Sequence, residues 1–424
     1  MTFKIISLGC KVNSYECSAL RSLLISNGLE ESKDDNADVA IINTCSVTAT
    51  ADQKSRQHIR KLRKLYPNAI IVVMGCYSQN HHKYIYDELD ADIVVGTSNR
   101  AKIPSLIHSF NENHQKIDAT EEKPRFFNYE EMGVTSFSEN VRAYLKIQDG
   151  CDNFCSYCLI PITRGKSRSR DKNHIIEEAK YLVSKGYQEI VLTGIHVGGY
   201  GKDLVGYSFS DLVSDLSSLE GLKSLRISSI EESEIDEKLI TLLKERKNIA
   251  KHMHIPLQSG SSKVLKEMNR KYDKEAFIAK LHKIREMVPD IALTTDVIVG
   301  FPNESDEDFN ETIQTIKEAG FNMLHVFPFS RRENTKAFYM KNQISPEVKS
   351  ERSHILLDLS KRLWDEYLDK FNNQEVEVLI EEYDEKEGLY KGHTTNYLEV
   401  KVKSDHNIVG KYIKTIYKKL DNIE

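Results

Sequence analysis

Short apolar runs alternate with helical patterns twice along this chain, and this rhythm constrains the fold more than any other feature. The first series has apolar runs at residues 3–8, 39–43, 70–74 and 93–95, with helical patterns at 16–26, 49–65 and 79–89. The second has candidate strands at 141–147, 188–193, 223–228, 251–255, 291–298 and 322–327, with helices near 173–185, 208–218, 236–246, 274–287 and 305–319. Strands that alternate with helices form parallel sheets. The sequence therefore predicts an α/β protein with two parallel-sheet units.

The two series and the sequence around them predict three domains. We expect a parallel-sheet domain over residues 1–115, a polar linker over 116–140, a partial (β/α)6 barrel over 141–371 and a small domain over 372–424. Six parallel strands with right-handed crossovers suit a partial barrel better than a closed eightfold one. A long helix near 346–371 ends the barrel, and the short alternating runs that follow predict a small antiparallel β-barrel.

Composition indicates the cellular compartment of the protein. No apolar run approaches the roughly 20 residues of a membrane span, and the first fifteen residues lack the apolar core of a signal peptide. Six of the seven cysteines stand where they could bind metal, which argues for a reducing compartment and against disulfides. We therefore expect a cytoplasmic protein with no membrane partner. The net charge of −5 gives no global attraction to RNA, so any RNA site needs local basic stretches.

Cys151, Cys155 and Cys158 form a Cys-x3-Cys-x2-Cys loop directly after the first barrel strand. A four-iron cube held by only three thiolates keeps one iron free to bind another ligand. A structural zinc site is the alternative, and it would need a fourth Cys or His ligand. The spacing favours the iron–sulfur interpretation.

Three more cysteines predict a second metal site. Cys10, Cys45 and Cys76 each fall just beyond the end of one of the first three apolar runs. Because the carboxyl ends of parallel strands meet at one sheet edge, these thiols should converge there. Any one of them alone would more simply be a buried small residue, but three at equivalent positions favour a shared iron–sulfur cluster. Cys17 lies on the predicted first helix and is expected to be an ordinary thiol.

The loop of Cys151 to Cys158 resembles that of the radical S-adenosylmethionine (SAM) enzymes. The resemblance implies that SAM chelates the free iron of a 4Fe–4S cluster and is cleaved to a 5′-deoxyadenosyl radical. Tyr157 matches the aromatic position near the adenine of SAM, and Gly194 lies in a segment like the one that meets its amino group. A core aromatic and a tight turn are the respective alternatives.

Polar residues follow three further barrel strands, and we expect them to complete the SAM-binding site. Each could instead be a satisfied cap or buried polar group, but together they favour a ligand site. From these segments we expect contacts to SAM from Arg226, Ser228, His254, Gln258 and Val299.

The chain as a whole resembles the methylthiotransferase family. The resemblance rests on Gly9-Cys10-Lys11-Val12-Asn13, Asn43-Thr44-Cys45, Gly75-Cys76, the radical loop, the segment His254 to Gly260 and the C-terminal β domain. It implies an N-terminal cluster domain, a radical SAM barrel and a TRAM-like RNA-binding domain. Residues 9–16 and 54–57 further resemble the branch that acts on N6-threonylcarbamoyladenosine at tRNA position 37. In the isopentenyladenosine branch, Gln-Met usually stands in place of Lys11-Val12. Glu333-Asn334 departs from the Pro-Gly that is common in the family, which leaves the role of Arg331 and Arg332 open.

This resemblance implies that two SAM molecules and two 4Fe–4S clusters deliver a methylthio group to carbon 2 of the adenine. Cys10, Cys45 and Cys76 would hold the sulfur-carrying cluster, and the radical loop the second. The implied partners are the anticodon stem-loop of tRNA, an electron donor such as flavodoxin or ferredoxin, and a sulfur donor. The adenine would have to leave the anticodon stack to react.

Basic residues are the candidate RNA contacts. Arg164, Arg168 and Arg170 follow the radical loop, where the carboxylate of SAM is a competing partner. Six basic residues between Lys54 and Lys64 share one predicted helix, which a solvated charged helix would explain equally well. In the last domain we expect RNA contacts from Lys411 and Lys414.

Three other functions remain open at this point. A methylthiotransferase for isopentenyladenosine-37 or for a ribosomal-protein aspartate would share both clusters. A protein of another class, a non-catalytic RNA-binding protein stabilised by metal, would need the cysteines only as structural ligands.

Overall fold

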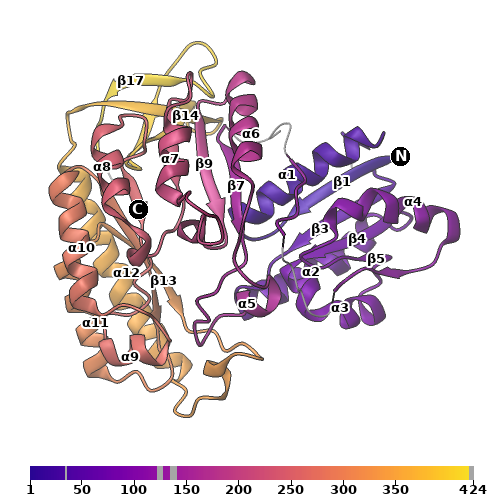
Figure 1. Ribbon diagram of the computed structural model, residues 1–424, viewed down its shortest axis with the longest axis horizontal. Helices are drawn as coiled ribbons and strands as arrows, with labels where there is room; N and C mark the ends of the chain where they lie inside the picture. Colours follow the sequence, from indigo (N-terminus) through magenta and orange to yellow (C-terminus); the bar gives the residue numbers. More distant parts are fainter. Residues whose placement is uncertain (34–35, 122–127, 134–140, 420–424) are drawn as a thin grey trace.

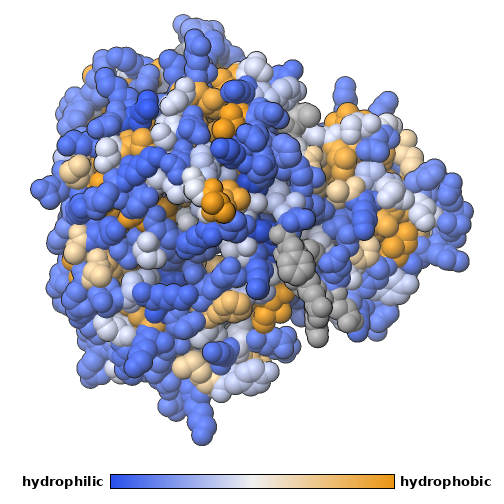
Figure 2. Space-filling model, in the orientation of Figure 1, coloured by the Kyte–Doolittle hydropathy of each residue, from blue (hydrophilic) through white to orange (hydrophobic). Residues whose placement is uncertain are grey.

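The computed structural model describes residues 1–33, 36–121, 128–133 and 141–419 of the chain. Figure 1 shows a smaller N-terminal unit beside a larger one, with the last strands packed at one end of the larger unit. In the described part, no helix is both long and apolar enough to cross a bilayer. On the face seen in Figure 2, hydrophilic residues cover most of the surface.

The N-terminal unit is a six-stranded parallel sheet between two layers of helices. Its strands follow the order β2-β1-β3-β4-β5-β6. They are β1 (Thr2–Ser7), β2 (Glu30–Glu31), β3 (Val39–Thr44), β4 (Ile70–Gly75), β5 (Ile93–Val94) and β6 (Ile117–Asp118). The helices are α1 (Lys11–Ser26), α2 (Ala49–Leu65), α3 (Cys76–Glu88) and α4 (Ile103–Asn113), with the 3-10 turn η1 (Arg100–Lys102) before α4.

The core of this unit explains why β3 and β4 read as unbroken apolar runs. Every residue of both strands is buried. One face packs with α1 and α4, as at Leu20 and Ile103, and the other with α2 and α3, as at Ile59 and Ile85. A parallel strand covered on both faces has no polar side to show. The four predicted strands are therefore confirmed. Strands β2 and β6 were not predicted, because their residues, Glu30–Glu31 and Ile117–Asp118, form no apolar run.

The larger unit is an open β/α barrel. Its six parallel strands are β7 (Ala143–Asp149), β9 (Glu189–Gly194), β10 (Ser224–Ile227), β11 (His252–His254), β12 (Ala292–Val299) and β13 (Met323–Pro328). The outer helices are α6 (Lys172–Ser184), α7 (Phe209–Ser217), α8 (Glu237–Glu245), α10 (Lys274–Met287) and α11 (Asp306–Ala319). All six predicted strands are confirmed.

The barrel strands form two hydrogen-bonded groups. One has the order β10-β9-β7-β8, where the short β8 (Arg168–Ser169) is antiparallel, and the other has the order β11-β12-β13. A single parallel bridge from Leu225 to Ile249 spans the join. Shorter elements decorate the loops: α5 (Ile160–Thr163), α9 (Ser262–Glu267), η2 (Val197–Gly199), η3 (Glu232–Glu234) and η4 (Lys336–Tyr339).

The C-terminal residues form a small antiparallel sheet against the barrel. Helix α12 (Pro346–Asp369) packs on β13 and leads into β14 (Glu375–Asp384), β15 (Leu389–Thr394), β16 (Glu399–Val402) and β17 (Tyr412–Ile416). The strand order is β16-β15-β14-β17. Tyr367 and Phe371 at the end of α12 share a core with Ile380 and Tyr417 of the sheet. The predicted antiparallel domain is thus confirmed as a four-stranded sheet anchored on α12.

Candidate functional site

The first three cysteines meet at the carboxyl edge of the N-terminal sheet. Cys10 precedes α1, Cys45 follows β3, and Cys76 is the first residue of α3. Cys10 is exposed and the other two are buried. Burial raises the pKa of Cys76 to about 11 and also raises the pKa of Cys45, and the nearby Cys10 adds to both shifts. The three thiols are therefore electrostatic neighbours, as the strand ends predict.

Glycine makes the close approach of these loops possible. Gly9 has a φ of +101°, and a Cβ on it would lie 2.8 Å from the Cys45 sulfur. Gly75 has a φ of +104°, and its Cβ would lie 2.3 Å from the Asn43 amide oxygen. Both the dihedral angle and the missing Cβ are needed at each position.

The other three cysteines occupy the loop after β7. Cys151, Cys155 and Cys158 are all half-buried. Burial, with smaller contributions from Cys155 and Cys151, raises the pKa of Cys158 to about 12. Sulfur-directed donors surround the loop: Ile160 N lies 3.4 Å from the Cys158 sulfur, and Arg270 Nη1 lies 3.5 Å from that of Cys155.

His196 completes the surroundings of the radical loop. Its Nε2 lies 2.8 Å from the Glu234 carboxylate. Although burial alone would lower the pKa of His196, its hydrogen bonds to Cys151 and Glu234 raise it to about 10. Glu234 therefore holds the imidazole of His196 beside Cys151.

Both thiol trios fit a four-iron cluster by the chemistry of their donors. Each offers three sulfurs with at least one N–H group directed at a sulfur, and such hydrogen bonds are one means by which proteins tune cluster potentials. Around the first trio the donor is Arg164, whose Nε lies 3.4 Å from the Cys76 sulfur. Among the described residues, no three His, Cys, Asp or Glu side chains stand close enough to hold a single metal ion. In a cube, each thiolate bonds a different iron.

A cavity of about 850 Å³ lies between the two units. Gly9, Cys10, Lys11 and Val12 form its N-terminal wall, and Ile160, two residues after Cys158, lies at its edge. Its barrel wall includes four residues that the sequence predicted for SAM, namely Gly194, Arg226, Ser228 and His254. The exposed thiol of the first trio and the predicted SAM residues therefore face one space.

Polar atoms in the cavity wall fit a polar ligand such as SAM. The Ser228 hydroxyl and His252 Nδ1 are buried and have no hydrogen-bond partner in the described structure. His252 itself is only 8% exposed. Buried polar atoms normally have partners, so a bound ligand would satisfy both. His254 is already oriented by Thr294 Oγ1 at 3.0 Å and Asp296 at 3.2 Å.

Three other residues predicted for SAM lie outside the cavity wall. Tyr157 packs edge-on against Phe301, with ring centroids 6.5 Å apart, beside a small apolar group under the loop. Gln258 has a φ of +62° and uses its backbone to bridge Asp296 and Ile298. Val299 is fully buried at the end of β12. The structure therefore does not bring these three residues into the cavity wall.

Arg226 joins the cavity to the C-terminal sheet. Its guanidinium pairs with Glu189 at 3.1 Å and donates to the Thr395 carbonyl at 3.0 Å. It also lies 4.3 Å from the ring centroid of Tyr397, which lines the same cavity. The side chain is thus 1% exposed, and its hydrogen bonds go to protein groups.

The expectation that Arg164, Arg168 and Arg170 contact RNA is wrong. All three are at most 3% exposed. Arg164 bonds Glu16 at 2.8 Å, Arg168 pairs with Asp149 at 3.3 Å, and Arg170 pairs with Glu178 at 2.6 Å. A guanidinium buried among carboxylates would leave them unpaired if it turned to a phosphate, which is costly.

The predicted RNA contacts of the last domain do lie on the surface. Lys411 and Lys414 are both exposed, and Lys414 pairs only loosely with Glu375 at 3.4 Å between side chains that are themselves exposed. On α2, Lys54, Arg60, Lys61 and Lys64 are exposed, whereas Arg63 pairs with Asp92 at 2.6 Å.

A buried ion network, which the sequence did not predict, fixes the two units together. Glu16 of α1 is 0% exposed and contacts Arg100, Lys146 of β7 and Arg164. Lys146 in turn lies 2.7 Å from Asp149. Charged residues are almost never fully buried unless they are paired. An acidic residue within the buried face of α1 was the one signal of this network in the sequence.

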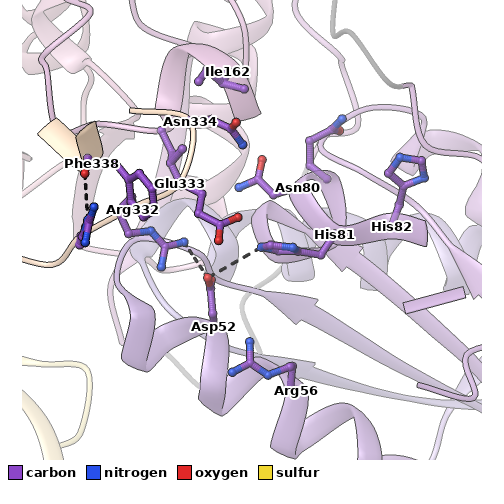
Figure 3. Close-up of a pocket in the computed structure, with 13 residues that line it drawn as sticks. Asp52, Arg56, Asn80, His81, His82, Ile162, Arg332, Glu333, Asn334 and Phe338 are labelled. Atoms are coloured by element: carbon purple, nitrogen blue, oxygen red, sulfur yellow. Dashed lines mark hydrogen bonds and ion pairs between the residues drawn. The ribbon is translucent and has the colours of Figure 1, made fainter. Parts of the chain in front are cut away.

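A second tie joins the loop after β13 to the loop after β3. Arg332 Nη2 lies 2.7 Å from Asp52 and 3.1 Å from the Ser46 carbonyl, one residue after Cys45. Figure 3 shows Asp52 between Arg332 and His81 at the edge of a second pocket, of about 550 Å³. Arg331 turns away and stacks on Phe338 instead. Arg332 therefore positions the cysteine edge of the N-terminal sheet.

Comparison with known proteins agrees with this site. The profile of the Radical SAM superfamily matches residues 145–316, and that of Uncharacterized protein family UPF0004 matches residues 2–96. Among solved structures, the radical S-adenosylmethionine methyltransferase TsrM from Kitasatospora setae has a TM-score of 0.60 at 13% identity, over 79% of this chain and 76% of that one. The fold and the three-thiol loop thus define a radical SAM enzyme, which uses SAM and a 4Fe–4S cluster.

Curated relatives narrow the class. The chain is 45% identical to "Threonylcarbamoyladenosine tRNA methylthiotransferase MtaB" of Bacillus subtilis, over 96% of this chain and 92% of that protein. It is 36% identical to the protein of the same name from Aquifex aeolicus, over 97% and 98%. It is also 32% identical to "tRNA-2-methylthio-N(6)-dimethylallyladenosine synthase" of Hydrogenobaculum sp., over 99% and 97%. The chain belongs to the methylthiotransferase family of radical SAM enzymes.

Proposed function

We infer that this protein adds a methylthio group to carbon 2 of N6-threonylcarbamoyladenosine at position 37 of tRNA, with two SAM molecules and two 4Fe–4S clusters. The observation that carries this proposal is the shared cavity, because Cys10 of one thiol trio faces the predicted SAM residues across it. The 45% identity to the Bacillus subtilis relative named for threonylcarbamoyladenosine, against 32% to the Hydrogenobaculum relative named for dimethylallyladenosine, supports the choice of base.

The second cluster is part of this proposal. It rests on Cys10, Cys45 and Cys76, which meet at one sheet edge with Arg164 donating to a sulfur. When bound, SAM and the clusters supply radical chemistry, which an unactivated aromatic C–H requires because acid–base groups have no handle on it.

The protein groups around the cavity would bind and orient the reactants. Gly194 admits a ligand close to the backbone, and Ser228, Arg226 and His254 would line the SAM site. Tyr157, Gln258 and Val299 would shape that site from the layer behind it. Arg164, Arg270 and His196 would hold positive charge beside the cluster thiolates.

The remaining partners follow from the same reaction. Lys411 and Lys414 would contact the tRNA backbone from the C-terminal sheet. A reductant such as flavodoxin or ferredoxin and a sulfur donor would complete the cycle, which would run in the cytoplasm where tRNA is modified. Residues 1–115, 141–371 and 372–424 would act as the cluster, radical and RNA-binding domains, with 116–140 as the link.

One anaerobic incubation tests the proposed function. The purified protein, a reductant, SAM and an anticodon stem-loop RNA carrying threonylcarbamoyladenosine at position 37 should give the 2-methylthio nucleoside by mass spectrometry. Stem-loops with isopentenyladenosine or plain adenosine serve as controls. Methylthiolation of the isopentenyl RNA alone would overturn the choice of base.

A deletion strain tests the substrate in the cell. Nucleosides from its tRNA should lack methylthio-threonylcarbamoyladenosine, while the ribosomal proteins keep their modified aspartate. Loss of the aspartate modification with intact tRNA would refute the proposal in favour of a protein substrate.

Metal analysis separates the enzyme from a metal-stabilised binding protein. After anaerobic purification we expect about eight iron atoms per chain, as two cubes require. Zinc in place of iron would support the non-catalytic alternative.

A further inference from the structure

Few charged side chains line the cavity between the two units. Its lining contains one acidic residue, Asp296, and two residues with permanent positive charge, Lys11 and Arg226. Asp296 is paired with His254 at 3.2 Å, and Arg226 is paired with Glu189. His252 and His325 also line the cavity, and burial lowers the pKa of both, which keeps them neutral. Because Arg226 is paired with Glu189, Lys11 is the one permanently charged cation of this lining without an ion-pair partner among the described residues.

Within the described part of the chain, Lys11 is the unpaired cation of this cavity wall. Its side chain is exposed and enters no ion pair with the described residues. Its charge reaches the two neutral histidines across the cavity and contributes to lowering their pKa. Lys11 therefore lines a cavity whose opposite wall is made of barrel residues, although it belongs to the N-terminal unit.

The local backbone adds to the preference for an anion. Lys11 is the first residue of α1, a helix of sixteen residues, and Cys10 gives that helix no side-chain cap. Free N–H groups at a helix start favour negative charge. Across the cavity, the buried Nδ1 of His252 has no partner in the described part of the chain.

The proposed substrate carries one anionic group beyond its phosphates, the carboxylate of the threonyl unit. In the adenine ring, carbon 2 and the carbon that bears N6 flank the same nitrogen, N1. A pose that brings carbon 2 to the Cys10 edge of the cavity therefore keeps the N6 substituent on that side of the ring, in the same cavity that Lys11 lines.

We propose that Lys11 is the residue that recognises the threonyl carboxylate and thereby selects the modified adenine. This inference rests on the proposed function and identifies the group that sets substrate specificity. The carboxylate of SAM is the competing anion in the same cavity, so the test must distinguish the two.

The test uses two anticodon stem-loop RNAs that differ in one group. One carries threonylcarbamoyladenosine at position 37, and the other carries the same nucleoside with the threonyl carboxylate converted to its neutral amide. Binding of each is measured by fluorescence anisotropy to the wild-type holoenzyme, Lys11→Met and Lys11→Arg. SAM binding and iron content are measured on every variant.

We expect the wild type to bind the carboxylate RNA about tenfold more tightly than the amide RNA, as a charge-assisted hydrogen bond provides. In Lys11→Met this preference should fall to about onefold, because affinity for the carboxylate RNA drops while that for the amide RNA is kept. Lys11→Arg should retain most of the preference. SAM affinity and iron content should not follow the charge at position 11.

Several results would overturn the inference. Equal binding of the two RNAs by the wild type would do so without any variant, even if Lys11→Met lost its iron. A Lys11→Met enzyme that keeps the tenfold preference, or that loses SAM affinity instead, would also refute it. If the wild type methylthiolates the carboxylate RNA yet binds both RNAs equally, only the role of Lys11 falls. If it methylthiolates neither RNA, the proposed function itself falls.

Discussion

Gly75 shows how a residue without a side chain can decide whether a metal site forms. It precedes Cys76 with a φ of +104°, and a Cβ there would meet the Asn43 side chain and the Thr44 backbone at 2.3 and 2.5 Å. Contacts that short with backbone cannot be relieved by a rotamer change. The loops that carry Cys45 and Cys76 would have to separate.

We therefore predict that Gly75→Ala loses the N-terminal cluster and keeps the other. Anaerobic iron analysis should fall from about eight to about four atoms per chain. Gly28→Ala is the matched control, because Gly28 also has a positive φ, +82°, but has nothing within 4 Å of its would-be Cβ. It should cost about 1 kcal/mol of stability and no iron. Full iron in Gly75→Ala would refute the packing argument.

The two thiol trios should also differ in what their loss abolishes. Cys151→Ala should form no 5′-deoxyadenosine, because it removes a ligand of the radical cluster. Cys10→Ala should still cleave some SAM, uncoupled from methylthio transfer, because the barrel loop is intact. Chromatography of SAM products checks both variants. Wild-type levels of cleavage in Cys151→Ala would contradict the assignment.

At this scale the sequence predicted the thiols but not the neighbours of the arginines. The positions of the cysteines at the sheet edge could be predicted, because the apolar runs show where the strands end. Arg164 looked like a phosphate contact because its partners Glu16 and Asn13 lie about 150 positions away in the chain. No local pattern indicates a pair so remote. Arg170 differs, because its partners Glu178 and Glu131 lie only 8 and 39 positions away.

At the scale of elements, strands and helices could be predicted from the sequence wherever they were long and buried on a defined face. All ten predicted parallel strands formed, whereas the two-residue strands β2 and β6 were missed. Loops were less predictable, because their shape follows contacts with other elements. The Arg332 loop is the example, since its anchor is a helix 280 positions earlier.

Arg332 provides the test at this scale. Arg332→Met should release the loop after β13 from Asp52 and Ser46 and so let the cysteine edge shift away from the barrel. Methylthio transfer should fall at least tenfold while 5′-deoxyadenosine formation continues, since misplacing reactants slows a reaction steeply. Arg331→Met in the same loop is the control, because Arg331 contacts only Phe338 among the described residues. Equal losses of both activities in Arg332→Met would argue against a positioning role.

Helix α11 offers a prediction on pH. Asp308 in its first turn accepts from Ser261 Oγ at 2.7 Å and lies 2.6 Å from Lys263. Although burial would raise its pKa, these bonds and those from Ser305 lower it to about 2, from a usual 3.8. A lowered folded pKa stabilises the fold above the unfolded value, so the contribution is complete at pH 7. It should be lost as the pH falls from about 4 to about 2.

Hydrogen exchange measures this contribution. In Asp308→Asn at pH 7, the first-turn amides of α11 should exchange several-fold faster, equivalent to about 1 kcal/mol, typical of a lost cap. The comparable cap of α7, Ser208 with Asp211, should be unchanged. Unaltered exchange in α11 would contradict the argument.

At the scale of the whole molecule, the two units are joined through charges that water does not reach. Glu16 lies at the centre, fully buried with Arg100, Lys146 and Arg164 around it. Removing one member of a buried ion group is more damaging than never having had it, because the others stay buried without a partner.

Glu16→Gln should therefore destabilise the docking of the N-terminal unit by about 3–5 kcal/mol. Amides of α1 and β7 should lose protection from hydrogen exchange together. Glu30→Gln, an exposed change in the same unit, should alter neither. Loss of protection in α1 alone would show that the network stabilises the helix and not the junction.

Through Arg226 and Tyr397, the last fifty residues help to shape the cavity between the two units. The tyrosine belongs to the C-terminal domain yet forms part of the cavity wall, and the arginine beneath it is held by carbonyls of the same segment. The C-terminal domain, which is expected to bind the nucleic acid, thus also forms part of the wall of the proposed active-site cavity. Deleting this domain would change the turnover of reactants bound in the cavity. A domain from another protein would replace it only if it supplied the same wall residues.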